Sequence, residues 1–180
     1  IDGADGDDDI VFGYAGDDVI AGGEGTNTLF GGTGDDVFIG GDGADAFRGG
    51  AGQDNLDYSN SDAAVNVNLE TGVLSGGDAD NDSIISGIDG VIGSDFDDTL
   101  IGFDQQSTNP ADTFTNQLYG GAGEDYIEGQ GGNDDLDGGA DDDEIYGGAG
   151  EDEIAGGTGA DYIEGGDGDD VIYGGDNGAG

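Results

Sequence analysis

The sequence lacks the residues on which most enzyme and nucleic-acid chemistry depends. It contains no cysteine, histidine, lysine, methionine or tryptophan, and its single basic residue is Arg48. Without cysteine, neither disulfides nor thiol chemistry are available. Without histidine, lysine or a G-x-S-x-G motif, no nucleophile and base form a recognisable pair. A phosphate-binding basic face is also missing. We therefore expect no catalysis within this chain and no binding to nucleic acid.

Long apolar runs are missing as well. No segment is apolar over the roughly 18 residues that a membrane-spanning helix needs. The beginning, IDGADGDDDI, is acidic and does not resemble a signal peptide. We expect no membrane insertion, and the chain has the character of a piece of a larger protein.

Acidic residues and glycine dominate what is present. The chain has 44 Asp and Glu residues, 44 glycines and a formal net charge of −43. This composition alone favours a disordered chain, because little apolar surface is available to offset the loss of conformational entropy on folding. Self-repulsion also opposes a compact state unless counterions bind.

A nine-residue phrase, however, repeats in register. Six units run from Ala4 to Asp57 and six more from Gly120 to Tyr173, among them GGAGEDYIE and GGTGADYIE. The sixth place is aspartate in 11 of these 12 units, and the eighth place is apolar in all 12. The unit GSDFDDTLI, residues 93–101, continues the same register. Disorder requires no such register, so the repeat favours a folded chain.

Each phrase predicts a turn followed by a short strand. In Tyr162-Ile163-Glu164, one apolar residue stands between two outward-facing neighbours, which is the period of a strand. The glycine-rich part supplies the turn, since glycine accepts positive φ at little cost. Two phrases then form one coil of 18 residues, and stacked coils form an all-β parallel solenoid.

The phrase G-G-x-G-x-D-x-apolar-x resembles the RTX (repeats-in-toxin, haemolysin-type) calcium-binding nonapeptide repeat. The resemblance implies a parallel β-roll, a right-handed solenoid. It also implies that sixth-place acids of neighbouring coils hold Ca²⁺, with turn carbonyls completing the shell. Oxygen-only ligands suit calcium and disfavour zinc or copper. Because one coil buries only two eighth-place side chains, we expect folding to require calcium.

The expected calcium ligands are the sixth-place residues, which should form two columns on opposite edges of the roll. They are Asp9, Asp18, Asn27, Asp36, Asp45, Asp54, Asp82, Asp98, Asn116, Asp125, Asp134, Asp143, Asp152, Asp161 and Asp170. Asparagine offers a weaker carbonyl ligand, and Ser107 marks a missing site. Pairs of neighbours predict on the order of ten ions. The alternative for each aspartate is an Asx-turn role, which a column in register makes less attractive.

The repeat divides the chain into three segments: a roll block at 1–57, a spacer at 58–92, and a second roll block at 93–180 with a loop near 102–115 that contains Pro110. In the spacer, AAVNVNLETGVLS predicts a hairpin that turns at residues 70–72. Asp78, Asp80 and Asp82 resemble the start of an EF-hand loop, but Ser83 stands where glycine is needed. We prefer a repeat with one inserted residue, in which Asp82 and Ile84 are the aspartate and apolar pair. The segment is also similar to spacers between β-roll blocks of RTX proteins, including bacterial alginate epimerases.

The outward places carry apolar residues in the first block and tyrosine with glutamate in the second. Phe12, Val19, Phe30, Val37 and Ile39 indicate either ordinary β-rich surface or a face covered by a packing partner domain. The tyrosines indicate cross-strand packing with glutamate, with a sugar-stacking platform as the alternative.

The resemblance implies a calcium-folded structural module of a secreted bacterial protein. RTX proteins leave the cell through type I secretion, and low cytosolic calcium would keep the chain unfolded until it meets extracellular calcium. Two alternatives remain open. One is a non-catalytic, carbohydrate-associated module of a polysaccharide-modifying enzyme; the other is a segment of an adhesin or surface-layer protein.

Overall fold

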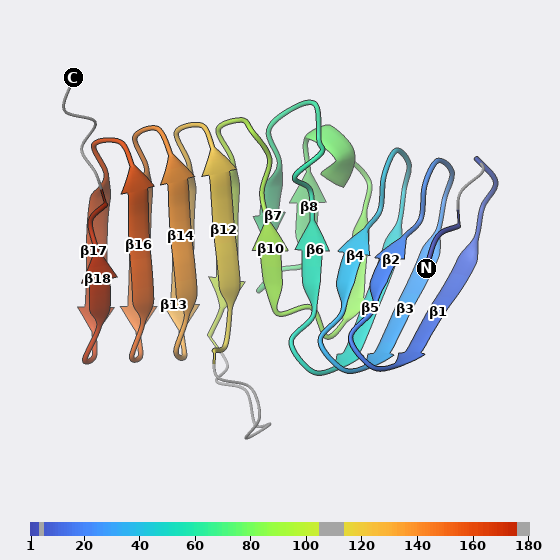
Figure 1. Cartoon of the computed structure of the whole chain (residues 1–180), viewed down its shortest axis with the longest axis horizontal. Helices are drawn as coiled ribbons and strands as arrows, with labels where there is room; N and C mark the ends of the chain where they lie inside the picture. Colours follow the sequence, from blue (N-terminus) through green and yellow to red (C-terminus); the bar gives the residue numbers. More distant parts are fainter. Residues whose placement is uncertain (4–5, 105–113, 176–180) are drawn as a thin grey trace.

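The computed structural model describes residues 1–3, 6–104 and 114–175 and shows a long, flattened roll of short strands (Figure 1). The first strands lie at one end of the roll and the last strands at the other. Ser107, Pro110 and most of the loop expected near residues 102–115 lie outside the described residues. The predicted all-β class and parallel solenoid are confirmed.

One layer of the roll is a single parallel sheet that runs along its whole length. We call it the long sheet. Its strands, in order, are β2 (Val19–Ala21), β4 (Val37–Ile39), β6 (Asn55–Asp57), β10 (Gly90–Ile92), β12 (Gln117–Ala122), β14 (Asp135–Ala140), β16 (Glu153–Thr158) and β18 (Val171–Tyr173). Most neighbours pair at a distance of 18 residues, as Leu136 does with Leu118 and Ile154. This distance is the predicted coil length.

The second layer is divided into two shorter sheets. The N-terminal sheet contains β1 (Ile10–Ala15), β3 (Thr28–Thr33), β5 (Ala46–Ala51) and β9 (Ser83–Ser86). The C-terminal sheet contains β17 (Tyr162–Asp167), β15 (Glu144–Ala149), β13 (Tyr126–Gly131), β11 (Thr99–Phe103), β7 (Asn66–Asn68) and β8 (Val73–Ser75). Except at β7, β8 and β9, which follow one another in the second layer, the chain alternates between the long sheet and one of these, so consecutive nine-residue units belong to opposite layers.

The eighth-place residues fill the space between the layers. Within the N-terminal sheet, for example, Val11 pairs with Leu29, and Leu29 with Phe47. Almost all eighth-place side chains are fully buried in one continuous cluster. At the last strand, Ile172 is 47% exposed. The core is therefore narrow, because each coil contributes only two eighth-place apolar side chains to it, one from each layer.

The middle of the chain contains the predicted hairpin, in which β7 and β8 are antiparallel and Val67 lies opposite Leu74. A short 3₁₀ helix, η1 (Gly77–Ala79), follows. Residues 83–92, expected in the spacer, provide β9 and β10, one strand to each layer. Ile84 lies beside Phe47, in the eighth place of its unit as expected. Val91 is buried between Leu56 and Leu118.

Candidate metal sites in the turns

The sixth-place residues stand at the entrance of each strand and are linked into columns. In most links a side-chain oxygen, usually Oδ1, accepts the backbone N–H of the sixth-place residue one coil earlier, at 2.7–3.2 Å. Column one, before the N-terminal sheet, is Asp9, Asn27, Asp45 and Asp82. Column two, before the long sheet, contains Asp18, Asp36, Asp54 and Asp89, and then Asn116, Asp134, Asp152 and Asp170. Column three, before the C-terminal sheet, is Asp98, Asp125, Asp143 and Asp161.

All fifteen expected ligands therefore stand in a column, and the structure adds Asp89. The side chain of Asp89 accepts the N–H of Asp54 through Oδ2 at 3.1 Å. Its unit was missed because it lacks the double glycine of the phrase. The pattern G-x-D-x-apolar, here Gly87, Asp89 and Val91, is the signal that identifies it. Because the second layer is divided, the columns number three rather than the two expected.

The second carboxylate oxygen, Oδ2, is the distinctive feature of the columns. Within the described residues, ten sixth-place aspartates bury an Oδ2 that has no hydrogen-bond partner: Asp9, Asp18, Asp36, Asp45, Asp54, Asp125, Asp134, Asp143, Asp152 and Asp161. Burying a charged oxygen without a partner is costly unless a counter-charge reaches it. The repetition of the same unsatisfied atom indicates a ligand that binds at each coil.

The first-place glycine of each unit shows where this oxygen points. A methyl group added to Gly129 would meet Asp134 Oδ2 at 2.5 Å and the carbonyl oxygen of Gly147 at 2.7 Å. At Gly13, the same two positions, Asp18 Oδ2 and the Gly31 carbonyl, would lie at 2.8 and 2.7 Å. A carboxylate oxygen and a carbonyl oxygen of the next coil thus converge on one point. Two acceptors facing one another suit a hard cation such as Ca²⁺.

A second ladder, not anticipated from the sequence, runs through the fifth places in the opposite direction. Here Oδ1 accepts the N–H of the fifth-place residue one coil later, at 2.8–3.0 Å. The acceptors are Asp8, Asp17, Asp35, Asp97, Asn133 and Asp142. The recurring Asp-Asp pair at places five and six is the signal that could have identified it. The five aspartates among these acceptors are exposed and add negative charge to the outside of their turns.

No three His, Cys, Asp or Glu side chains in the described ranges come together as a metal-binding cluster. This follows from the repeat, because each turn brings one inward carboxylate, which in most coils lies beside one backbone carbonyl of the next coil. The residues present fit a cation held by one or two carboxylates and several carbonyl oxygens. They do not fit a site made of side chains alone.

Burial raises the pKa of several column carboxyls. It brings those of Asp54, Asp125 and Asp134 to about 7 and that of Asp143 to about 6, with smaller contributions from neighbouring carboxylates. Backbone hydrogen bonds lower these pKa values but do not cancel the burial. In the ion-free roll these groups therefore hold protons up to near-neutral pH.

We expect the ion-free chain to gain strand structure when the pH is lowered from about 7.5 to about 4.5. A folded-state pKa above the unfolded value means that the native state binds more protons, so stability is greatest at low pH and is lost as the pH rises through about 7. Far-UV circular dichroism in chelator measures this. With calcium, protons should instead compete with the ion and weaken its binding. An ion-free chain that is equally unfolded at both pH values would contradict the prediction.

Three expected ligands differ from the ten. Oδ2 of Asp82 and Oδ2 of Asp98 accept hydrogen bonds from protein hydroxyls, and Nδ2 of Asn116 donates to a backbone carbonyl. Asn27 differs again, because its buried Nδ2 has no partner among the described residues. Asp170, in the last described turn, is half-buried and accepts the N–H of Asp152 at 3.2 Å.

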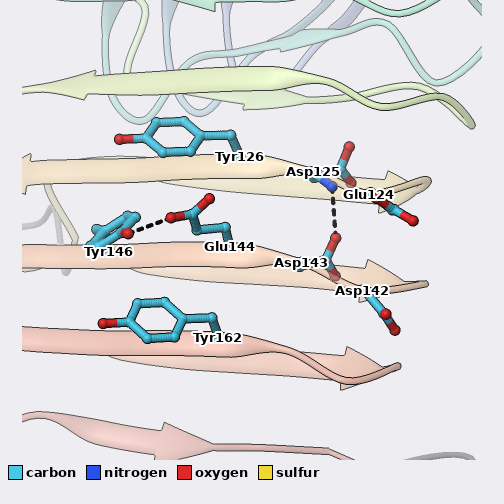
Figure 2. A pocket seen from close by; sticks show the side chains of 8 residues that line it. All are labelled: Glu124, Asp125, Tyr126, Asp142, Asp143, Glu144, Tyr146 and Tyr162. Carbon is cyan, nitrogen blue, oxygen red and sulfur yellow. Dashed lines mark hydrogen bonds between the residues drawn. The ribbon is translucent and has the colours of Figure 1, made fainter.

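An open hollow of about 310 Å³ lies beside column three (Figure 2). Its floor is a ladder formed by Tyr126, Tyr146 and Tyr162, whose ring centroids are 5.7 and 5.8 Å apart. Each hydroxyl donates to a glutamate two residues away: Glu128, Glu144 and Glu164 respectively. These hydrogen bonds lie within single strands, while the strand register places each tyrosine opposite a glutamate of the neighbouring strand, as the cross-strand interpretation expects.

The apolar outer residues of the first block do not form one surface. Phe12 and Phe30 stack at 4.7 Å on the N-terminal sheet, whereas Val19, Val37 and Ile39 belong to the long sheet in the opposite layer. A single partner domain on one face therefore cannot cover all five. The described part of the chain also contains no helix with the length and apolar character needed to cross a membrane.

Comparison with known families gives one finding. The model of the RTX calcium-binding nonapeptide repeat matches four times, at residues 1–29, 22–56, 111–145 and 146–177, and these ranges together cover more than half of the chain. No curated protein matches the sequence.

Proposed function

The chain belongs to the RTX calcium-binding nonapeptide repeat family, and on this premise we propose that it is a non-catalytic structural module that folds when its turns bind calcium. Ca²⁺ takes about six to eight oxygen ligands in a flexible shell. The column aspartates and the first-place carbonyls supply such oxygens in every regular coil.

The ten buried Oδ2 atoms without a partner are the observation that carries this proposal. In a chain of net charge −43, each such atom adds repulsion that the thin core does not offset. A divalent ion at each coil offsets both the charge repulsion and the cost of burying an oxygen without a partner, because it neutralises the carboxylate and is coordinated by its Oδ2. Calcium binding free energy then becomes folding free energy.

Calorimetric titration of the chain with CaCl₂ tests the proposal. We expect on the order of ten bound ions, and the variant Asp36→Asn should bind at least one fewer. Asp62→Asn, which removes the same charge from an exposed residue outside the columns, is the matched control and should keep the full number. Absence of calcium binding, or equal loss in both variants, would refute it.

We further propose that the module acts outside a bacterial cell. A chain that repels itself without calcium is suited to export in an extended state and to folding in extracellular calcium. Efficient secretion of a variant that folds without calcium would argue against this order of events. Any activity of a larger protein would belong to segments other than these repeats.

A further inference from the structure

We infer that the roll holds two separate calcium arrays, residues 9–54 and 125–161, divided by a waist in which protein groups replace the ion. The waist contains the sixth-place positions Val65, Asp82, Asp98 and Asn116, together with Asp89, whose Oδ2 accepts the N–H of Asp54. This inference rests on the proposed function, since it assigns which of the similar turns bind calcium. The unpartnered Oδ2 atoms occur on both sides of these positions and at none of them.

At Asp82, a tyrosine hydroxyl takes the position of a cation. Asp82 Oδ1 accepts the N–H of Asp45 at 2.7 Å, as in every column. Its Oδ2, however, accepts the hydroxyl of Tyr58 at 2.9 Å. Tyr58 is 3% exposed and is packed into the core. The oxygen that lacks a partner in the regular coils is therefore satisfied by a neutral donor.

At Asp98, the donor is a serine four residues earlier. Ser94 donates its backbone N–H to Oδ2 of Asp98, and its hydroxyl lies 2.9 Å from Oδ1 and 3.1 Å from Oδ2. Ser94 occupies the second place of its unit, where Gly121 and Gly139 have φ of 115° and 107°. Ser94 does not have a positive φ, so this turn has a different backbone conformation that brings its donors onto the carboxylate.

At Asn116, the side-chain amide nitrogen takes the place of both the carboxylate oxygen and the calcium ion proposed for the regular coils. Nδ2 donates to the first-place carbonyl of Gly129 at 3.0 Å, to Asp134 Oδ1 at 2.9 Å and to the Phe103 carbonyl at 3.2 Å. In regular coils the corresponding first-place carbonyl faces an Oδ2, and two acceptors meet. Here a donor meets acceptors, so no cation is needed to hold them together.

Val65 completes the waist with an apolar side chain. It opens column three, and its N–H donates to Asp98 Oδ1 at 2.7 Å, but it offers no carboxylate. Asn27, inside the first array, is different from Asn116 because its buried Nδ2 has no hydrogen-bond partner in the part of the chain that the structure describes. Val65, Asp82, Asp98 and Asn116 therefore share one property: the turn is held by hydrogen bonds or apolar burial and leaves no buried carboxylate oxygen without a partner among the described residues.

Ion counts on single variants of the full chain test the inference, with CaCl₂ as the probe and circular dichroism to confirm that each variant folds. Asp82→Asn should bind as many ions as the unmodified chain, whereas Asp36→Asn and Asp143→Asn should each bind at least one fewer. If Asp82→Asn does not fold, Tyr58→Phe provides the same information: it frees Oδ2 of Asp82 and should add one ion. Loss of an ion in Asp82→Asn, or no gain in a folded Tyr58→Phe, would overturn the inference.

Ser94 offers a matched pair of variants that creates a site. Ser94→Gly restores the double glycine and permits a positive φ, so we expect one additional ion. Ser94→Ala removes the same hydroxyl but does not favour a positive φ, so we expect no additional ion. Equal counts in the unmodified chain and Ser94→Gly would contradict the assignment of Asp98 to the waist. A chain that binds no calcium at all would instead refute the proposed function itself.

Discussion

Chelation of calcium is expected to abolish the β-strand signal of the 180-residue chain in far-UV circular dichroism. Without the ion, ten Oδ2 atoms are buried with no partner among the described residues, and eight of them converge with a carbonyl oxygen of the next coil. The remaining acids repel one another in a chain of net charge −43. Each coil has only two eighth-place side chains to oppose this, and ordering its 18 residues costs about 1–2 kcal/mol per residue in backbone entropy. The unfolded chain should therefore be the stable ion-free state near neutral pH.

Addition of excess calcium should restore the signal, and magnesium should not replace it. Mg²⁺ demands near-ideal octahedral geometry and gives up its waters reluctantly, which a shell of fixed turn carbonyls does not accommodate. High concentrations of a monovalent salt serve as the control for simple charge screening. A strand signal that survives chelation, or that sodium chloride restores as fully as calcium, would show that folding is not coupled to this ion.

Gly129→Ala is expected to destabilise the roll strongly. The added carbon would lie 2.5 Å from Asp134 Oδ2 and 2.7 Å from the Gly147 carbonyl, so backbone of the next coil must move. Overpacking of this kind costs about 1–3 kcal/mol, and sometimes more. It also displaces a proposed calcium ligand. We expect lower stability in urea at fixed calcium and the loss of at least one bound ion.

Gly174→Ala is the matched control, because Gly174 is also a first-place glycine and its added methyl would meet none of the described residues within 4 Å. Neither glycine has a positive φ, so the comparison isolates the close approach from backbone conformation. We expect Gly174→Ala to retain both the stability and the ion count of the unmodified chain. Equal effects of the two substitutions would show that the close approach of Asp134 Oδ2 and the Gly147 carbonyl to Gly129 is not essential for stability or calcium binding.

The nine-residue period was enough to predict the coil, the core and most column positions. An apolar eighth place fixes which side chain faces inward, and a sixth place two residues earlier must then lie at the turn, as Asp143 and Ile145 do. The same local logic explains why Asp89 was missed: its unit keeps only Gly87, Asp89 and Val91 of the phrase. The hydrogen bonds of the columns confirm the register of the sixth places.

What the period could not predict depends on partners distant in sequence. Nothing near Asp82 indicates that Tyr58, 24 residues earlier, donates to its carboxylate. The division of the second layer follows from the hairpin of β7 and β8, which begins a new sheet. The grouping of Phe12 with Val19 was wrong for a geometric reason, since consecutive units alternate between layers and cannot share a face.

The division of the second layer also has a mechanical consequence. Only the long sheet crosses the middle of the molecule without interruption, while the opposite layer ends in β9 and begins again in β7 and β8. Figure 1 shows the strands of the N-terminal half inclined to those of the C-terminal half. Among the described residues, no strand pairing joins the two halves of the second layer, whereas β10 pairs with both β6 and β12. Tension along the roll would therefore be carried across its middle by the strand pairs of the long sheet.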